Sequence, residues 1–184
     1  MNPFFRLYQG NGRKRMSKPT ERDIARIRAR QAHEDHNIFS RLPAVYAASR
    51  SQGQKFLQHG GGLSIVEWRT LWDLCEVGPM TIRDLAAIQR TDHSLLSRAL
   101  PEMRRKGFVT MHRDAKDGRQ MIVEIAEAGR AAYETAAPVM ARRRAALRAV
   151  FSEEEVNQFV GYLDRLEDFL RTPIDEFLEE DRAE

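Results

Sequence analysis

Apolar residues recur every three or four positions along most of the chain, and this spacing predicts a mainly helical fold. The first such stretch runs from about Glu21 to Leu57, with Ile38, Leu42 and Val45 on one side. Three glycines, residues 60–62, then interrupt the pattern. An apolar stripe on one long helix has to be covered, so we expect this helix to pack against other helices.

The next helix is predicted from its capping residues. Ser64 and Glu67 have the spacing of a capping box, in which a hydroxyl and a carboxylate each bond a free amide of the first turn. Helical periodicity continues to about Glu76, and Gly78-Pro79 ends it.

Two further helices follow closely. Thr81 is placed to cap a short helix that reaches Gln89, and Asp92 is placed to cap another that reaches Lys106. Gly107 stops the second one. A short helix, a tight turn and a second helix make the helix-turn-helix pattern.

A β-hairpin is predicted directly after these helices. Phe108 to Arg113 alternates weakly between apolar and polar, and Gln120 to Ile125 is rich in strand-forming residues. Asp117-Gly118 between them is typical of a two-residue hairpin turn. A hairpin in this position turns a helix-turn-helix into a winged helix.

The chain then returns to helix, from Arg130 to about Val150 and again, after a capping box at Ser152 and Glu155, to about Arg171. The last helix carries a continuous apolar stripe that the small winged-helix core cannot cover. We therefore expect the first, penultimate and last helices to form a homodimer. The predicted organisation is a basic arm (1–20), a dimerisation region (21–59 and 130–184) and a winged-helix domain (60–129).

Composition supports a soluble globular protein and adds a charge asymmetry. Apolar residues make up 42% of the chain and charged residues 31%, with a mean hydropathy of −0.57. Met1 to Phe151 carries 27 Lys and Arg against 15 Asp and Glu, whereas Ser152 to Glu184 carries 3 against 12. A basic body of this kind favours a polyanionic partner. No apolar run is long enough for a membrane span or a signal peptide, so we expect the cytoplasm and no membrane contact.

The helix predicted from Asp92 to Lys106 has a polar side that suits the DNA major groove. At 100° per residue this side faces away from Leu96, Leu100 and Met103. Short hydroxyls and Arg can read base edges there, and cations late in the helix or on the hairpin suit phosphates or the minor groove. The candidate base-edge residues are His93, Ser94, Ser97 and Arg98. The candidate cations are Arg104, Arg105, Lys106, Arg113, Lys116 and Arg119, with Asp114 as a partner that orients Arg119.

Five motifs in register resemble the MarR family of bacterial transcriptional regulators. They are Leu63-Ser64-x-x-Glu67-Trp68-Arg69, Asp92-His93-Ser94-Leu95-Leu96-Ser97-Arg98, Lys106-Gly107-Phe108-Val109, Arg113-Asp114-x-x-Asp117-Gly118-Arg119 and Ala128-Gly129-Arg130. The resemblance implies a dimeric winged-helix regulator that binds double-stranded DNA at a pseudo-palindromic operator. It also implies repression in most cases, and release by a small aromatic acid or an oxidant.

Three positions depart from the family pattern. Arg90 replaces the glycine of the turn between the two central helices, so the turn either changes geometry or tolerates a side chain. Pro101 lies inside the presumed recognition helix, where we expect a local bend with the ring facing outward. Ala126 stands where a capping Thr is common.

Other functions remain as alternatives. Tyr46, Trp68 and Trp72 are candidates for an effector cleft, although aromatics at these spacings also suit a core. Cys75 lies among apolar residues, which favours an inert thiol. His33 and His36 have a ligand-like spacing without the usual zinc context, and we expect no metal or cofactor.

No nucleophile with a base, phosphate-binding glycine loop or pair of catalytic carboxylates points to an enzyme. The main competitor of a DNA-binding regulator is a dimeric helical module whose winged helix binds protein.

Overall fold

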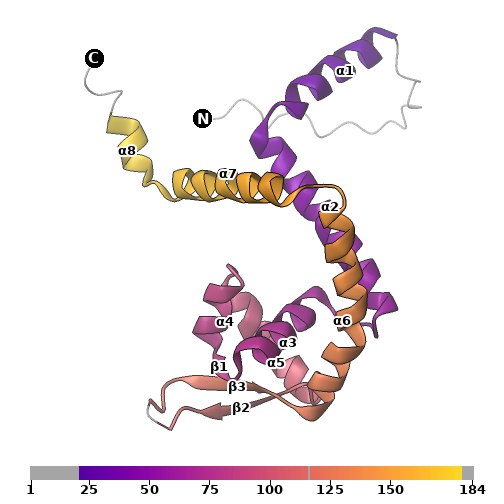
Figure 1. The fold of residues 1–184 in the computed structure, drawn as a ribbon. Helices are drawn as coiled ribbons and strands as arrows, with labels where there is room; N and C mark the ends of the chain where they lie inside the picture. The colour runs from indigo at the N-terminus through magenta and orange to yellow at the C-terminus, as the bar shows by residue number, and fades with distance from the viewer. Residues whose placement is uncertain (1–20, 116, 180–184) are drawn as a thin grey trace, which may run out of the picture. The chain divides into compact units, whose positions relative to one another are not determined.

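The computed structural model describes residues 21–115 and 117–179, and they form eight helices and three short strands (Figure 1). The predicted mainly helical winged-helix fold is confirmed. The described residues up to Ala48 form one compact unit, and Ser49 onward forms a second. The predicted basic arm, residues 1–20, lies outside the described residues.

The predicted single helix from Glu21 to Leu57 is wrong, because the chain forms two helices there. These are α1 (Glu21–Asp35) and α2 (Ile38–His59). Asn37 begins the second one: its side-chain oxygen accepts a hydrogen bond of 3.0 Å from the Phe39 amide. Asn is a strong N-cap residue, and this local signal interrupts the longer apolar pattern.

Helix α3 (Ile65–Val77) begins at the predicted capping box. The Glu67 amide donates to Ser64 Oγ at 3.2 Å, and the Ser64 amide donates to Glu67 Oε2 at 2.7 Å. The helix ends where the sequence predicts, because Gly78 has φ +95°, which side chains rarely adopt.

The helix-turn-helix consists of α4 (Ile82–Ile88) and α5 (His93–Arg105). The predicted caps are present: Thr81 accepts from the Asp84 amide, and Asp92 accepts from the Ser94 amide at 2.8 Å. Pro101 is exposed, as predicted, and α5 continues past it to Arg105.

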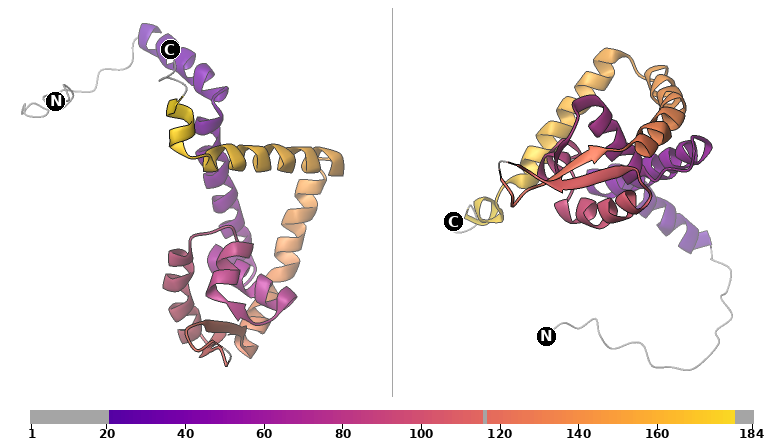
Figure 2. Two further views of the ribbon diagram at one scale, coloured as in Figure 1. Left: turned by 90° about the vertical axis from the view of Figure 1, so that its left-hand side faces the viewer. Right: turned by 90° about the horizontal axis from the view of Figure 1, so that it is seen from below.

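The wing is a hairpin of β2 (Val109–Arg113) and β3 (Met121–Ile125), and β1 (Met80–Thr81) pairs with the other edge of β3. The hairpin is confirmed, but its turn is longer than two residues. Strand pairing ends at Arg113 and Met121, so residues 114–115 and 117–120 belong to the loop at the end of the sheet far from α6 (Figures 1 and 2). Strand β1 has only two residues, too few to produce an alternating pattern.

The core lies where the inner sides of α3, α5 and the sheet meet. Leu71, Leu96 and Leu100 are fully buried in it, as is Val123 of β3. Gly129 packs so closely on the base of the wing that a Cβ there would overlap the Phe108 carbonyl, which explains the glycine in this motif.

The C-terminal part consists of α6 (Glu127–Arg148), α7 (Glu153–Arg171) and α8 (Ile174–Glu179). Helix α6 starts three residues earlier than predicted, and Ala126 precedes it without a side-chain cap. The capping box of Ser152 and Glu155 starts α7 as predicted. The short α8 was not predicted. None of the described helices has the length and hydrophobicity that a membrane crossing would require.

Candidate nucleic-acid interface

The outward face of α5 presents the four candidate base-reading residues. His93, Ser94, Ser97 and Arg98 are all exposed. They face outward because Leu96, Leu100 and Met103 of the same helix are fully buried. The core therefore fixes the rotation of α5 about its own axis.

Contacts within α5 orient three of these side chains. His93 Nδ1 and Ser97 Oγ lie 3.1 Å apart, and Arg98 Nε donates to the Ser94 carbonyl at 3.1 Å. Polar groups held in this way lose less side-chain freedom when they bind a partner.

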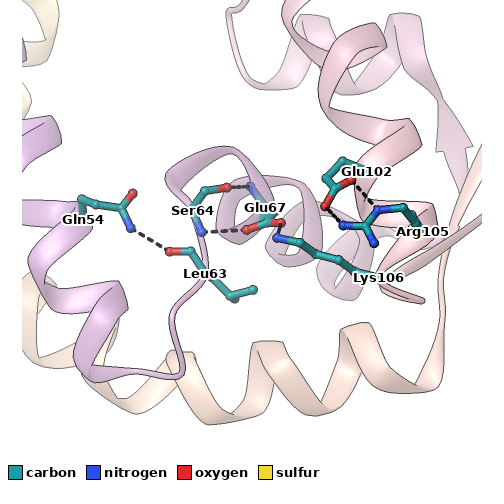
Figure 3. Close-up of polar contacts among 7 residues, drawn as sticks. All are labelled: Gln54, Leu63, Ser64, Glu67, Glu102, Arg105 and Lys106. Carbon is teal, nitrogen blue, oxygen red and sulfur yellow. Dashed lines mark hydrogen bonds and ion pairs between the residues drawn. The ribbon is translucent and has the colours of Figure 1, made fainter.

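The three cations at the end of α5 have different surroundings, and Figure 3 shows two of them, Arg105 and Lys106. Arg105 forms a two-bond ion pair with Glu102 at 2.6 and 2.8 Å, and this arginine holds the pKa of the Glu102 carboxyl below its usual value. Arg104 is exposed and makes no ion pair with another described residue. Lys106, expected near phosphates, instead donates to Glu67 at 2.7 Å.

The contact between Lys106 and Glu67 links the end of α5 to the start of α3. The Glu67 side chain is 7% exposed, and it caps α3 while it accepts from Lys106 at the end of α5. Burial acts to raise the pKa of the Glu67 carboxyl, but the hydrogen bonds from Lys106 and Ser64 outweigh it, so the pKa falls below its usual value. The carboxylate therefore remains charged and joins the two helices.

The wing loop is held by its own polar groups. Arg113 Nη1 donates to the Gly118 carbonyl at 2.6 Å, so this cation braces the loop. Asp117 accepts from the Gln120 side chain at 2.9 Å and from the Arg119 amide at 3.1 Å, and these bonds lower the pKa of the Asp117 carboxyl. The Arg119 side chain remains exposed at the loop.

Two wing residues stay as predictions. Lys116 lies outside the described residues. Asp114 accepts a long bond of 3.4 Å from the Asp117 amide, and its predicted role as the partner of Arg119 is untested.

The turn between α4 and α5 tolerates a side chain where the family pattern has glycine. Arg90 has φ +46°, and among the described residues no other non-glycine has a positive φ. The Thr91 amide bonds the Ala86 carbonyl at 3.0 Å, and the Arg90 amide bonds the Ala87 carbonyl at 3.1 Å. This is a Schellman motif, and a non-glycine residue in its left-handed position costs about 1 kcal/mol.

A buried polar cluster that the sequence did not reveal anchors this turn. Gln89 is 4% exposed and donates to Asp73 at 2.8 Å and to Thr70 at 3.4 Å. Arg69 donates to the Gln89 carbonyl. Burial raises the pKa of Asp73, while the Gln89 bond and the Arg69 charge oppose it. The partners are 16 to 20 residues apart, so no local pattern could reveal them.

The candidate effector residues have unequal exposure. Trp68 is 3% exposed and stacks on Tyr133 with ring centroids 5.3 Å apart, so it is part of the core. Trp72 is half-buried, and the Arg144 guanidinium lies 4.9 Å from its ring centroid. Tyr46 is exposed on α2. Their role in effector binding stays a prediction.

Among the described residues, no contact supports a redox sensor at Cys75 or a metal site at His33 and His36. Cys75 is half-buried, 3.9 Å from Arg130 Nη1, and burial raises the pKa of its thiol. A raised thiol pKa lowers reactivity. His36 Nδ1 contacts the Ala32 carbonyl at 3.0 Å, and no cluster of three potential metal ligands occurs in residues 21–115 and 117–179.

Part of the chain is similar in sequence to a known protein family. Residues 61–120 match the sequence model of the MarR family. This segment is similar to the MarR family. It contains α3, α4, α5 and the wing loop, so it includes every candidate DNA-binding residue. No protein of curated function matches the sequence.

Solved structures of MarR-type regulators share the fold. A MarR/EmrR family regulator from Acinetobacter sp. ADP1 is 19% identical with a TM-score of 0.67, over 76% of this chain and 98% of that one. AbsC, a MarR family regulator from Streptomyces coelicolor, is 21% identical with a TM-score of 0.62, over 85% and 99%. A MarR mutant from E. coli in complex with operator DNA is 17% identical with a TM-score of 0.56, over 68% and 92%.

Proposed function

We propose that the protein is a homodimeric transcriptional regulator of the MarR type that binds double-stranded DNA at a pseudo-palindromic operator in the cytoplasm. The observation that carries this proposal is the exposed polar face of α5 together with the exposed Arg119 of the wing, on a segment that is similar to the MarR family. The E. coli relative with operator DNA supports the same type of partner.

The proposed contacts divide by chemistry. Ser94, Ser97, Arg98 and His93 read base edges from the major groove, where Arg can bond guanine through two hydrogen bonds. Arg104 and Arg119 bind the phosphate backbone or the minor groove, because their charges are not neutralised within the described residues. Arg105 has to exchange Glu102 for a phosphate, so it contributes less.

The exposed apolar surface of the C-terminal helices supports the dimer. No residue of α7 is buried. The large exposed apolar residues of α6, α7 and α8 and of the segment between α6 and α7 are Leu147, Val150, Phe151, Phe159, Val160, Tyr162, Leu163, Phe169, Leu170, Ile174, Phe177 and Leu178. So many exposed large apolar side chains are unusual on a monomer and favour an interface.

The N-terminal helices carry a second exposed apolar set, which we assign to the same dimer. Its members are Ile24, Ile27, Ile38, Phe39, Val45 and Tyr46. All six side chains are exposed in the single chain, and a symmetric dimer provides a partner chain that can cover them.

Repression and release by a small aromatic effector complete the proposal. Trp72 beside Arg144 combines an aromatic face with a cation, which suits an aromatic carboxylate, and Tyr46 and Trp68 are the other candidate residues. Benzoate is a direct probe, since the chain has two tryptophans and binding near them quenches their fluorescence. Trp72→Leu removes this quenching if the assignment is correct.

The experiment that tests DNA binding is a salt series. Fluorescence anisotropy with a labelled random duplex is expected to show binding at low salt that weakens as a power of the salt concentration, because bound cations release counterions. Absence of binding at low salt contradicts the proposal and favours the protein-binding alternative. Sedimentation of the free protein as a monomer contradicts the dimer.

A further inference from the structure

The turn before the recognition helix is connected to α7 by an arginine in an unusual backbone position. Arg90 Nη1 lies 3.2 Å from Glu167 Oε2 and 3.5 Å from Asp164 Oδ1. The two acids are three residues apart and share one side of α7. The contact joins residues 77 positions apart in the chain.

Backbone geometry makes this connection specific. A glycine would satisfy the left-handed position of the turn without strain, yet the chain has Arg there with φ +46°. Gln89 in the turn donates to Asp73 of α3, and Arg69 of α3 donates to the Gln89 carbonyl, so the surrounding structure imposes this conformation on Arg90. The side chain consequently leaves the turn at a fixed point.

The α7 side of the contact is also organised. Arg171 donates to Glu167 Oε1 at 3.2 and 2.5 Å, so the carboxylate that receives Arg90 is already held. These arginines keep the pKa of the Glu167 carboxyl below its usual value, with the Arg171 hydrogen bond as the main cause. Glu167 therefore stays charged at neutral pH and available to Arg90.

The contact is open to solvent and therefore adjustable. Arg90 is 69% exposed, Asp164 53% and Glu167 36%, and they line a surface hollow of about 400 Å³ with Asp168 and Arg171. Exposed ion pairs are weak and screened by salt. Such a contact biases an angle between two elements and does not lock it.

We propose that Arg90 is a positioning residue that sets the angle between the DNA-reading head and α7, and thereby the separation of the two recognition helices in the dimer. This inference rests on the proposed function, because α7 belongs to the proposed dimer interface and α5 to the proposed DNA interface. Arg90 then determines which half-site spacing the dimer prefers, without touching a base.

The test compares affinities for duplexes that differ only in half-site spacing. The preferred duplex is selected from a random pool with the wild-type protein, and versions with one base pair added or removed are made. For Arg90→Gln and for Glu167→Gln we expect the preference for the selected spacing to fall about two- to fivefold, the factor that corresponds to an exposed ion pair. The double variant should lose no more than either single one.

Two controls separate positioning from other roles. Arg83→Gln removes the same charge from α4 at an exposed residue and should weaken all spacings equally. Arg90→Gly relieves the backbone strain, so it should keep or raise the melting temperature while it still relaxes the spacing preference. A purely structural role for Arg90 predicts a lower melting temperature instead.

The outcomes are distinct. A spacing profile of Arg90→Gln that is parallel to wild type makes Arg90 a simple phosphate contact and overturns the inference. If the wild type binds no duplex, the proposed function fails. The role of Arg90 is then tested by a distance measurement on the free protein. Spin labels at Ala87→Cys in a Cys75→Ser protein report the distance between the two heads of a dimer, which Arg90→Gln should broaden. An unchanged distribution, or a monomer, overturns the inference.

Discussion

The three adjacent cations at the end of α5 have different roles, although they form one basic run in the sequence. Some stabilise the fold, and others are available to bind a partner. Lys106 is paired with the buried carboxylate of Glu67, Arg105 is paired with Glu102, and Arg104 is exposed. Adjacent cations of the same charge therefore have different effects when they are removed.

We expect Lys106→Met to lower the free energy of unfolding by about 1.5–3 kcal/mol, because it leaves a buried carboxylate without its charged donor. Arg104→Met likewise replaces a cation by methionine, and it should cost almost nothing in stability because Arg104 is exposed and makes no ion pair with another described residue. Urea denaturation of both variants measures this. Equal losses would contradict the assignment of Lys106.

The same pair predicts a pH dependence. The folded-state pKa of Glu67 lies below the ordinary value of 4.5, so its contribution is present above that pH and is lost as pH falls through the folded-state pKa. The stability gap between wild type and Lys106→Met should therefore close in acid. A gap that persists unchanged through the acid titration would exclude Glu67 as the partner.

Among the helices and strands, the features that depend on residues within one turn were predicted from the sequence. The features that depend on distant residues were not. Ser64, Thr81 and Ser152 start helices where the sequence indicates, because a cap involves residues within one turn. Strand β1 and the Gln89 cluster were missed because they depend on partners far along the chain. The cap at Asn37 was local, yet the apolar periodicity on both sides concealed it.

The wing and the recognition helix are expected to contribute differently to binding. Arg119→Ala should weaken binding to every duplex and reduce the slope of log affinity against log salt by about one, because one phosphate contact is lost. Arg142→Ala removes an exposed arginine of α6 and should leave the slope unchanged. A wild-type slope in Arg119→Ala would argue against wing insertion.

Substitutions on α5 should change base preference instead. Arg98→Ala or Ser94→Ala is expected to reduce discrimination between the preferred duplex and single-base variants, by about 1–3 kcal/mol where a two-bond contact is lost. Titration against a set of such duplexes measures this, with Arg104→Ala as the control that weakens all of them alike. If Arg98→Ala behaves like Arg104→Ala, both touch only the backbone.

For the molecule as a whole, the proposed function requires two copies of the chain. One winged helix presents one recognition helix, and in the proposed dimer the exposed apolar residues of the C-terminal helices join two of them. Two-fold symmetry then requires inverted half-sites on the DNA, about one helical turn apart. The fold alone does not fix this spacing, which depends on the dimer.

Selection of bound duplexes from a random pool tests DNA reading and dimerisation together. We expect enrichment of two inverted copies of a short sequence whose centres are separated by about 10 base pairs. A pool that remains unenriched at low salt, or that yields a single site without two-fold symmetry, would contradict a dimer that reads DNA through α5 and the wing.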